Sequence, residues 1–141
     1  MKSFVVDASV AIKWYLPEPH DAESLRLLNS SSQLLAPDIL FPELGNILWK
    51  RVTRAEFPRE TAVAILTALE TVPFQIWPSK LLIHTAFELA CHTKRTLYDS
   101  LYLALAISQE CPLVTADLKL YNALKKSLIG KALVWVEDIP S

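Results

Sequence analysis

Four acidic residues from distant parts of the chain fall where strands end or helices begin. Asp7 follows the apolar run FVV and Asp117 follows LVTA, so each ends an expected strand. Glu43 and Asp99 lie near the starts of expected helices. Two carboxylates about 4 Å apart repel by about 4 kcal/mol at an effective dielectric of 20, so clustered acids take up protons or a cation. Oxygen ligands without Cys or His favour Mg²⁺ or Mn²⁺.

Asp99 lies in the most apolar stretch of the chain, TLYDSLYLALAI at residues 96–107. Leucines recur there at helical spacing and almost no polar face remains, so this helix should be buried on most sides. A buried carboxylate costs several kcal/mol unless it is paired, hydrogen-bonded or bound to a cation. Taken alone, Asp99 also completes a capping box with Thr96, and Asp7 and Asp117 read as ordinary helix caps. The acids therefore indicate chemistry only as a group.

Short apolar strands alternate with helices along the whole sequence. We expect strands at 3–6, 34–36, 74–77, 113–116 and 132–136, and helices at 8–16, 21–28, 37–54, 58–71, 80–93, 96–107 and 118–127. This alternation predicts an α/β domain with a mainly parallel sheet. In such sheets sites gather beyond the carboxyl ends of the strands, near the point where the strand order reverses. The four acids are therefore expected to meet at one edge of the sheet.

The helix that carries Glu43 has unusual residues around it. Glu43 and Asn46 share one face at i,i+3 spacing. Pro42 should kink this helix or delay its regular start, and Gly45 costs about 1 kcal/mol relative to Ala. Both residues call for a packing or functional reason.

The amino-acid composition limits the classes to which this protein can belong. Lys and Arg number 14 against 15 Asp and Glu, so the charge balance does not indicate a nucleic-acid binder. The two glycines exclude a Gly-rich phosphate loop. A hydrophobic content of 52% argues against disorder, and we expect one domain over residues 1–141. No apolar run reaches the roughly 18 residues of a membrane span, and the N-terminus does not resemble a signal peptide, so we expect a cytoplasmic protein.

Other polar clusters have simpler explanations. A histidine-containing stripe has metal-ligand spacing on the polar face of its helix, so we expect it to be solvent-exposed: His84, Glu88 and His92. Cys91 and Cys111 are expected to pack as small apolar residues. A basic group could follow a phosphate backbone, although a solvated face is the commoner explanation: Lys50, Arg51, Arg54 and Arg59.

Four segments together resemble a PIN domain, and most closely the VapC-type toxin ribonucleases. They are FVVDAS, APDILFPELGN, TLYDSLYLALA and LVTAD, and the match runs in order over nearly the whole chain. The resemblance implies a three-layer α/β/α fold. It assigns a metal-binding and catalytic role to the four acids, with nearby polar support, as follows: Asp7, Glu43, Asp99 and Asp117, supported by Ser9 and Thr115, with Asn46 as a further candidate.

This resemblance implies hydrolysis of an RNA phosphodiester with Mg²⁺ or Mn²⁺ as the cofactor, giving 5′-phosphate and 3′-hydroxyl products. It also implies a cognate antitoxin and a homodimer. The three histidines show no paired arrangement for a histidine acid-base ribonuclease.

Two other classes of protein remain open at this point. A phosphatase or receiver-like phosphotransfer domain also gathers aspartates at strand ends around Mg²⁺. The chain lacks the adjacent second acid and the well-placed lysine expected of receivers, and Asp7-Ala8-Ser9 lacks the second aspartate of haloacid-type phosphatases. A non-catalytic PIN-like interaction module is the third possibility, against which the presence of all four acids argues.

Overall fold

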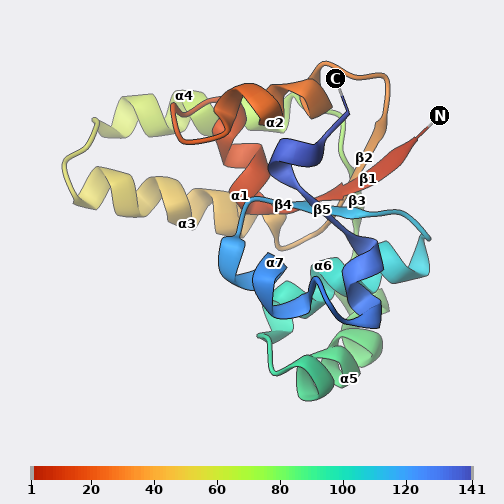
Figure 1. The fold of residues 1–141 in the computed structure, drawn as a ribbon. Coiled ribbons are helices and arrows are strands. Elements are labelled where there is room, and N and C mark those ends of the chain that lie inside the picture. Colours follow the sequence, from red (N-terminus) through yellow and green to blue (C-terminus); the bar gives the residue numbers. More distant parts are fainter. Residues whose placement is uncertain (1, 141) are drawn as a thin grey trace.

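Five short strands form one sheet in the order β3-β2-β1-β4-β5, and every neighbouring pair is parallel (Figure 1). The strands of this computed structural model are β1 (Ser3–Val6), β2 (Gln33–Pro37), β3 (Gln75–Trp77), β4 (Leu113–Thr115) and β5 (Leu133–Trp135). The structure describes residues 2–140. That residues 1–141 form a single domain stays a prediction, since Met1 and Ser141 lie outside the described part.

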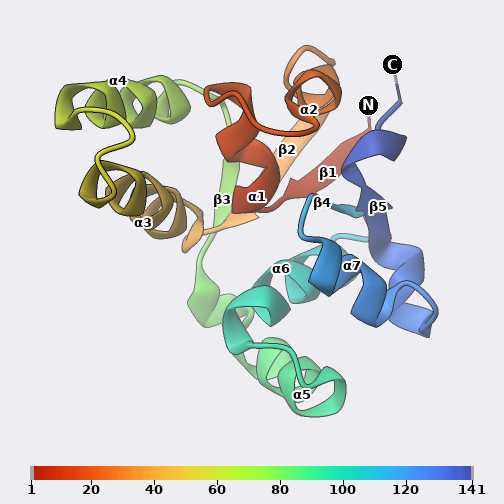
Figure 2. The same cartoon turned by 60° about the vertical axis from the view of Figure 1, so that its left-hand side comes forward.

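Seven α-helices connect the strands within residues 2–140. They are α1 (Ala8–Ala11), α2 (Asp21–Leu28), α3 (Leu40–Thr53), α4 (Arg59–Glu70), α5 (Ile83–Thr93), α6 (Leu97–Ser108) and α7 (Leu118–Leu124). Helices α1 to α4 cover one face of the sheet and α5 to α7 cover the other, as Figures 1 and 2 show. The predicted three-layer α/β/α arrangement is confirmed, and the sheet is parallel throughout.

Alternating side chains of the strands feed two separate hydrophobic cores. Phe4 and Val6 of β1 pack into the core beneath α1 to α4, whereas Val5 between them packs into the core beneath α5 to α7. Leu113 and Val114 of β4 divide in the same way. Because both faces of a parallel sheet are covered, its strands are apolar on both sides. This accounts for short apolar runs without a polar alternation.

Helix α6 is the most deeply buried helix of the domain. Residues 100–106 are all buried, with Leu103 and Leu105 fully enclosed. The helix packs against β1, β2, β4 and α5. Its predicted burial is therefore confirmed, and Thr96 caps it by accepting a hydrogen bond from the backbone N–H of Asp99.

The helices expected at 8–16, 37–54, 80–93 and 118–127 are shorter than the sequence predicts. The helix expected at 8–16 is α1 followed by a 3₁₀ turn at Ile12–Trp14. Pro17 cannot continue a helix, and the indole of Trp14 donates to the backbone oxygen of Ser24 at 2.9 Å. The helix expected at 118–127 ends at Leu124 because the chain turns back sharply. A Cβ at Gly130 would lie 2.3 Å from the backbone oxygen of Lys125.

The two unusual residues of α3 have different explanations. The helix begins at Leu40, so Pro42 lies in its first turn, where its missing N–H is not needed. Of the two expected effects of Pro42, the structure shows the delayed start, because α3 begins at Leu40 and not at residue 37. Gly45 is not required by packing, since an added Cβ would meet no atom within 4 Å.

The expectation for the cysteines is half wrong. Cys111 is buried, but Cys91 is exposed, because it lies on the outer face of α5 and not on the face that packs against α6. The stripe on the same helix is solvent-exposed, as predicted: His84, Glu88 and His92. Over the described residues, no helix has the length and apolar character that crossing a membrane requires.

Leu103→Ala should lower the free energy of unfolding by about 2 to 5 kcal/mol, because Leu103 is fully buried between the sheet and α5. Ile107→Ala is the matched control on the same helix. Ile107 is 44% exposed, and the change should cost less than about 1 kcal/mol. Urea denaturation measures both, and equal losses would contradict the arrangement of the layers.

Candidate active site

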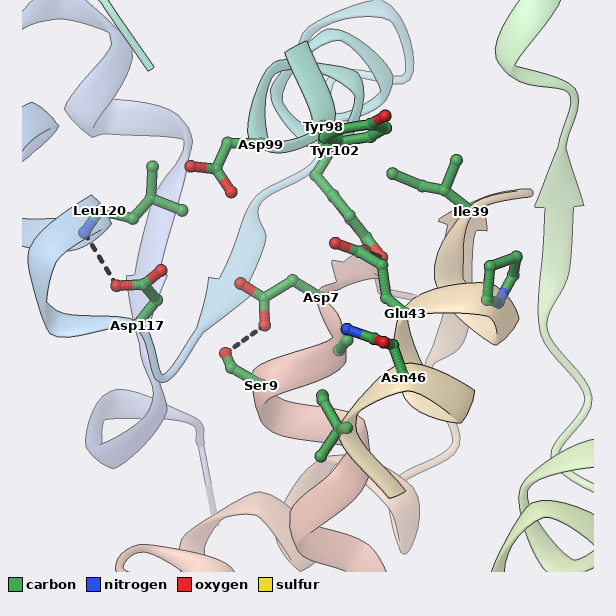
Figure 3. A pocket seen from close by; sticks show the side chains of 13 residues that line it. Asp7, Ser9, Ile39, Glu43, Asn46, Tyr98, Asp99, Tyr102, Asp117 and Leu120 are labelled. Carbon is green, nitrogen blue, oxygen red and sulfur yellow. Dashed lines mark hydrogen bonds between the residues drawn. The ribbon is translucent and has the colours of Figure 1, made fainter. Parts of the chain in front are cut away.

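A pocket of about 590 Å³ opens beyond the carboxyl ends of β1 and β4, where the strand order of the sheet reverses. Its lining combines acidic, amide and hydroxyl groups with apolar side chains: Asp7, Ala8, Ser9, Ile39, Pro42, Glu43, Asn46, Ile47, Tyr98, Asp99, Tyr102, Asp117 and Leu120 (Figure 3). The four predicted acids therefore face one pocket, although they come from four separate segments of the chain.

Asp7 is the most enclosed of these acids, with 8% of its surface exposed. It caps α1, and its Oδ1 accepts hydrogen bonds from the backbone N–H of Val10 and from the hydroxyl of Ser9. Burial raises the pKa of Asp7 from 3.8 to about 6, although hydrogen bonds from Ser9, Thr115 and Val10 lower it. The charge of Asp117 raises the pKa further. The site thus confines a carboxylate that favours a proton or a cation.

Asp117 follows β4 and caps α7. Its Oδ1 accepts from the backbone N–H of Leu120 at 3.1 Å, and its own N–H donates to the hydroxyl of Thr115 at 3.0 Å. The backbone N–H of Ala116 donates to the hydroxyl of Ser9 at 3.0 Å. Ser9 therefore joins the turn after β4 to the turn after β1, and it fixes Asp117 relative to Asp7.

Glu43 projects from the first turn of α3 and is held by a tyrosine of α6. The hydroxyl of Tyr102 donates to Oε1 of Glu43 at 2.6 Å (Figure 3). Burial raises the pKa of Glu43, the hydrogen bond from Tyr102 lowers it, and the charge of Asp99 raises it. Burial and the neighbouring Glu43 also raise the pKa of Tyr102, so its hydroxyl keeps its proton and remains the donor.

Asp99 is paired with the arginine four residues before it. Nη2 of Arg95 donates to Oδ2 of Asp99 at 3.2 Å, and both side chains are about a quarter exposed. Burial raises the pKa of Asp99, the Arg95 charge lowers it, and the charge of Asp117 raises it. Nε of Arg95 is buried and has no hydrogen-bond partner among the described residues. Arg95 therefore orients Asp99 from outside the pocket.

The lining of the pocket fits a hard divalent cation. Carboxylate, amide and hydroxyl oxygens are the donors that Mg²⁺ and Mn²⁺ take. Within residues 2–140, no three Asp, Glu, His or Cys residues are grouped closely enough to surround one ion. Mg²⁺ commonly keeps several waters and uses only one or two carboxylates plus substrate phosphate oxygens. Four mutually repelling acids around one pocket suit that mode of binding.

The structure brings all the predicted site residues except Thr115 into the lining of one pocket. The four acids, Ser9 and Asn46 line the pocket, and the buried Thr115 accepts a hydrogen bond from the N–H of Asp117. Sequence reasoning missed two partners of these acids, Arg95 and Tyr102. Both had a signal, because Arg95 lies four residues before Asp99 and Tyr102 lies three residues after it, on the same helical face.

The predicted basic group does not line this pocket. Arg51 pairs with Glu18, and its Nε lies 3.6 Å from Oε2 of Glu56. Glu18 also accepts from the buried Lys13 at 3.1 Å. Arg51 therefore belongs to an ion-pair network that joins α3 to the segment after α1. The remaining basic residues lie on the exposed surface: Lys50, Arg54 and Arg59.

Comparisons with known proteins identify the class. Residues 4–126 match the PIN domain, and the chain belongs to this family. A relative named ribonuclease VapC1, from Mycobacterium tuberculosis, is 35% identical over 124 residues, which cover 87% of this chain and 92% of the relative.

Solved structures share the fold. A crystal structure from Pyrobaculum aerophilum superposes with a TM-score of 0.73 at 24% identity, covering 96% of this chain and 85% of that chain. A toxin-antitoxin complex from Klebsiella pneumoniae superposes with a TM-score of 0.66 at 18% identity, covering 96% and 98%.

Asp7→Asn should change how stability depends on pH. Folded Asp7 keeps its proton up to a pH of about 6, whereas the unfolded chain loses it near 3.8. As the pH rises from 3.8 to about 6, the free energy of unfolding of the wild type should therefore decrease, by about 3 kcal/mol for this residue. The variant lacks that contribution, so its stability should fall less from pH 4 to pH 7 in the presence of EDTA. Identical pH profiles from urea denaturation would contradict the burial of an ionisable Asp7.

Tyr102→Phe should lower the free energy of unfolding by about 1 to 3 kcal/mol at pH 7, because it leaves the half-buried Glu43 without its donor. Tyr98→Phe removes the same hydroxyl from an exposed ring of the same helix and should cost less than about 0.5 kcal/mol. If both variants unfold at the same urea concentration, the hydrogen bond to Glu43 does not contribute to the free energy of unfolding.

Proposed function

We propose that this chain is a divalent-metal-dependent ribonuclease and the toxin of a toxin-antitoxin pair. The observation that carries the proposal is the convergence of Asp7, Glu43, Asp99 and Asp117 on one pocket at the reversal of the strand order. Membership of the PIN family and the 35% identity to a protein named ribonuclease VapC1 support a nuclease that acts on RNA.

The chain itself fixes the positions of its acids before any ligand arrives. Asp7 is held by Ser9 and the start of α1, and Glu43 is held by Tyr102. Arg95 does the same for Asp99. Preorganised ligands need little rearrangement when charge develops, which is the main source of electrostatic stabilisation in enzymes. These contacts therefore support a catalytic role for the acids.

Metal dependence is general among PIN-domain ribonucleases, and we propose Mg²⁺ or Mn²⁺ as the cofactor here. The ion would be held by one or two of the carboxylates of Asp7, Glu43, Asp99 and Asp117 together with water, with Asn46 and Ser9 as neutral neighbours. When bound, it lowers the pKa of an attacking water and offsets negative charge on the phosphate. Hydrolysis would leave a 5′-phosphate and a 3′-hydroxyl. The four carboxylates make the pocket negative, and their hydrogen-bonding partners hold them in the lining of the pocket.

The residues that line the pocket argue against a phosphotransfer domain. No lysine lines it within the described residues. Asp7, the candidate for phosphorylation, is 8% exposed, and both Ser9 and Val10 hydrogen-bond to its Oδ1. A nucleophilic carboxylate needs open access to phosphorus. Hydrolysis with water as the nucleophile needs no such access to Asp7.

We further propose a cognate antitoxin as protein partner, a homodimer as the working form and the cytoplasm as the compartment. The superposition with a chain of a toxin-antitoxin complex supports the partner at the level of the fold. The RNA substrate supports the compartment. Size-exclusion chromatography with light scattering tests the dimer directly.

Asp99→Asn should keep the fold and lower metal-dependent cleavage by at least about 100-fold, because it removes one negative ligand from the pocket. The assay incubates purified protein with defined tRNA and rRNA fragments in Mg²⁺, Mn²⁺ or EDTA. Glu88→Gln, at an exposed position of α5, is the matched control and should cleave like the wild type.

Circular dichroism checks that both variants are folded, and isothermal calorimetry with Mn²⁺ checks binding of the ion. Undiminished cleavage by folded Asp99→Asn would refute the assignment of the site. Cleavage that persists in EDTA would refute the metal dependence.

A further inference from the structure

One side of the pocket is apolar and takes no part in the chemistry proposed above. Tyr98, Ile39 and Pro42 are among the residues that line the pocket, and Figure 3 shows Tyr98 and Ile39 on the side away from Asp117. In Figure 3 the side chain of Tyr98 extends from α6 toward Ile39, whereas Tyr102 turns down toward Glu43. The two tyrosines of α6 therefore face different parts of the pocket, and only Tyr102 contacts an acid.

Tyr98 is unusually exposed for a residue of this helix. It is 61% exposed, whereas Tyr102, one turn along α6, is 3% exposed. An aromatic ring of this size usually contributes 150 to 250 Å² of buried surface in proteins. Tyr98 leaves most of that contact unmade, in a helix that is otherwise the best-packed element of the domain. Its ring is free to receive a flat partner.

The wall opposite Tyr98 is held in place by the backbone. Ile39 lies in the turn between β2 and α3, and Asp38 beside it donates its N–H to the backbone oxygen of Trp77 at 2.9 Å. Oδ2 of Asp38 accepts from the N–H of Ser79 at 3.1 Å. These bonds tie the turn to the end of β3. The apolar side of the pocket is therefore built on fixed elements on both sides.

Charge selects the part of an RNA that fits this apolar side. The four acids repel phosphate except where a cation is bound, so a second phosphate beside them is unfavourable. The base is the neutral, flat part of a nucleotide, and aromatic side chains stack on it. Tyr98 lines the same pocket as the four acids, so a base on its ring would belong to a nucleotide close to the phosphate that is cleaved.

We propose that Tyr98, with Ile39 and Pro42, forms a stacking site for one unpaired RNA base adjacent to the scissile phosphate. The inference rests on the proposed function and assigns a substrate-binding residue to it. A base within a duplex is already stacked on both faces, so the site selects single-stranded or looped RNA. The contact is sequence-tolerant, because every base has a face that stacks.

The test uses a fluorescein-labelled single-stranded RNA of about 20 nucleotides, taken from a fragment that the wild type cleaves. Tyr98→Ala should lower kcat/KM by roughly ten- to a hundred-fold, mainly through a higher KM, because base stacking on an aromatic ring is lost. Tyr98→Phe and Tyr98→Trp should restore it. Phe87→Ala is the matched control, since Phe87 is an exposed aromatic of α5, 59% exposed, and does not line the pocket.

An abasic nucleotide locates the stacked base. Placed in turn on either side of the cleaved bond, it should slow the wild type at one position by about the same factor as Tyr98→Ala. In Tyr98→Ala the abasic nucleotide at that position should have little further effect, because the same contact is already lost. Annealing the RNA to its complement should abolish cleavage by the wild type.

The outcomes separate this inference from the function on which it rests. If Tyr98→Ala cleaves the RNA like the wild type while Asp99→Asn is inactive, the nuclease assignment stands and the stacking site is wrong. If the abasic nucleotide slows Tyr98→Ala by the same factor as it slows the wild type, the two changes act independently and the stacking site is also wrong. The stacking site is also wrong if Tyr98→Ala weakens the binding of a protein partner but leaves RNA cleavage unchanged. A wild type without metal-dependent cleavage contradicts the proposed function itself.

Discussion

Repulsion among like charges is the constraint around which this domain is arranged. Asp7, Glu43, Asp99 and Asp117 face one pocket, and the charge of a neighbouring acid raises the pKa of at least three of them. The pocket is also partly shielded from water, which makes each ionised form more costly. Such a site is tolerable in the folded chain because each acid has a specific partner, and because a cation or protons can relieve the remaining charge.

The partners of the acids also build the fold. Asp7 caps α1 through Oδ1, which also accepts from the hydroxyl of Ser9, and Asp117 caps α7 through its own Oδ1. The N–H of Asp99 completes the cap of α6. Capping explains why three of the four acids are found at helix starts. It does not explain why all of them face the same cavity. Local stability and the proposed chemistry therefore use the same residues without conflict.

The pocket joins two kinds of surface that have different consequences for a substrate. Its acidic side attracts a divalent ion and repels bare phosphate, whereas its apolar side around Tyr98 suits a neutral planar group. Helix α6 contributes to both, because Tyr98, Asp99 and Tyr102 follow one another within its first two turns. The buried remainder of α6 holds them fixed. Rigidity of this helix is thus a condition for positioning an ion and a nucleotide together.

The sequence by itself determined the elements and the acids. Helical spacing of leucines predicts α6, and short continuous apolar runs predict strands such as Ser3–Val6, because both patterns are local properties of the sequence. Tertiary structure alone decided which side chains meet. The hydrogen bond from Tyr102 to Glu43 joins residues 59 positions apart in the sequence. Cys91 is exposed, although a small apolar residue of this type was expected to be buried. Such contacts depend on how α3 and α6 pack on opposite faces of the sheet, which no local pattern records.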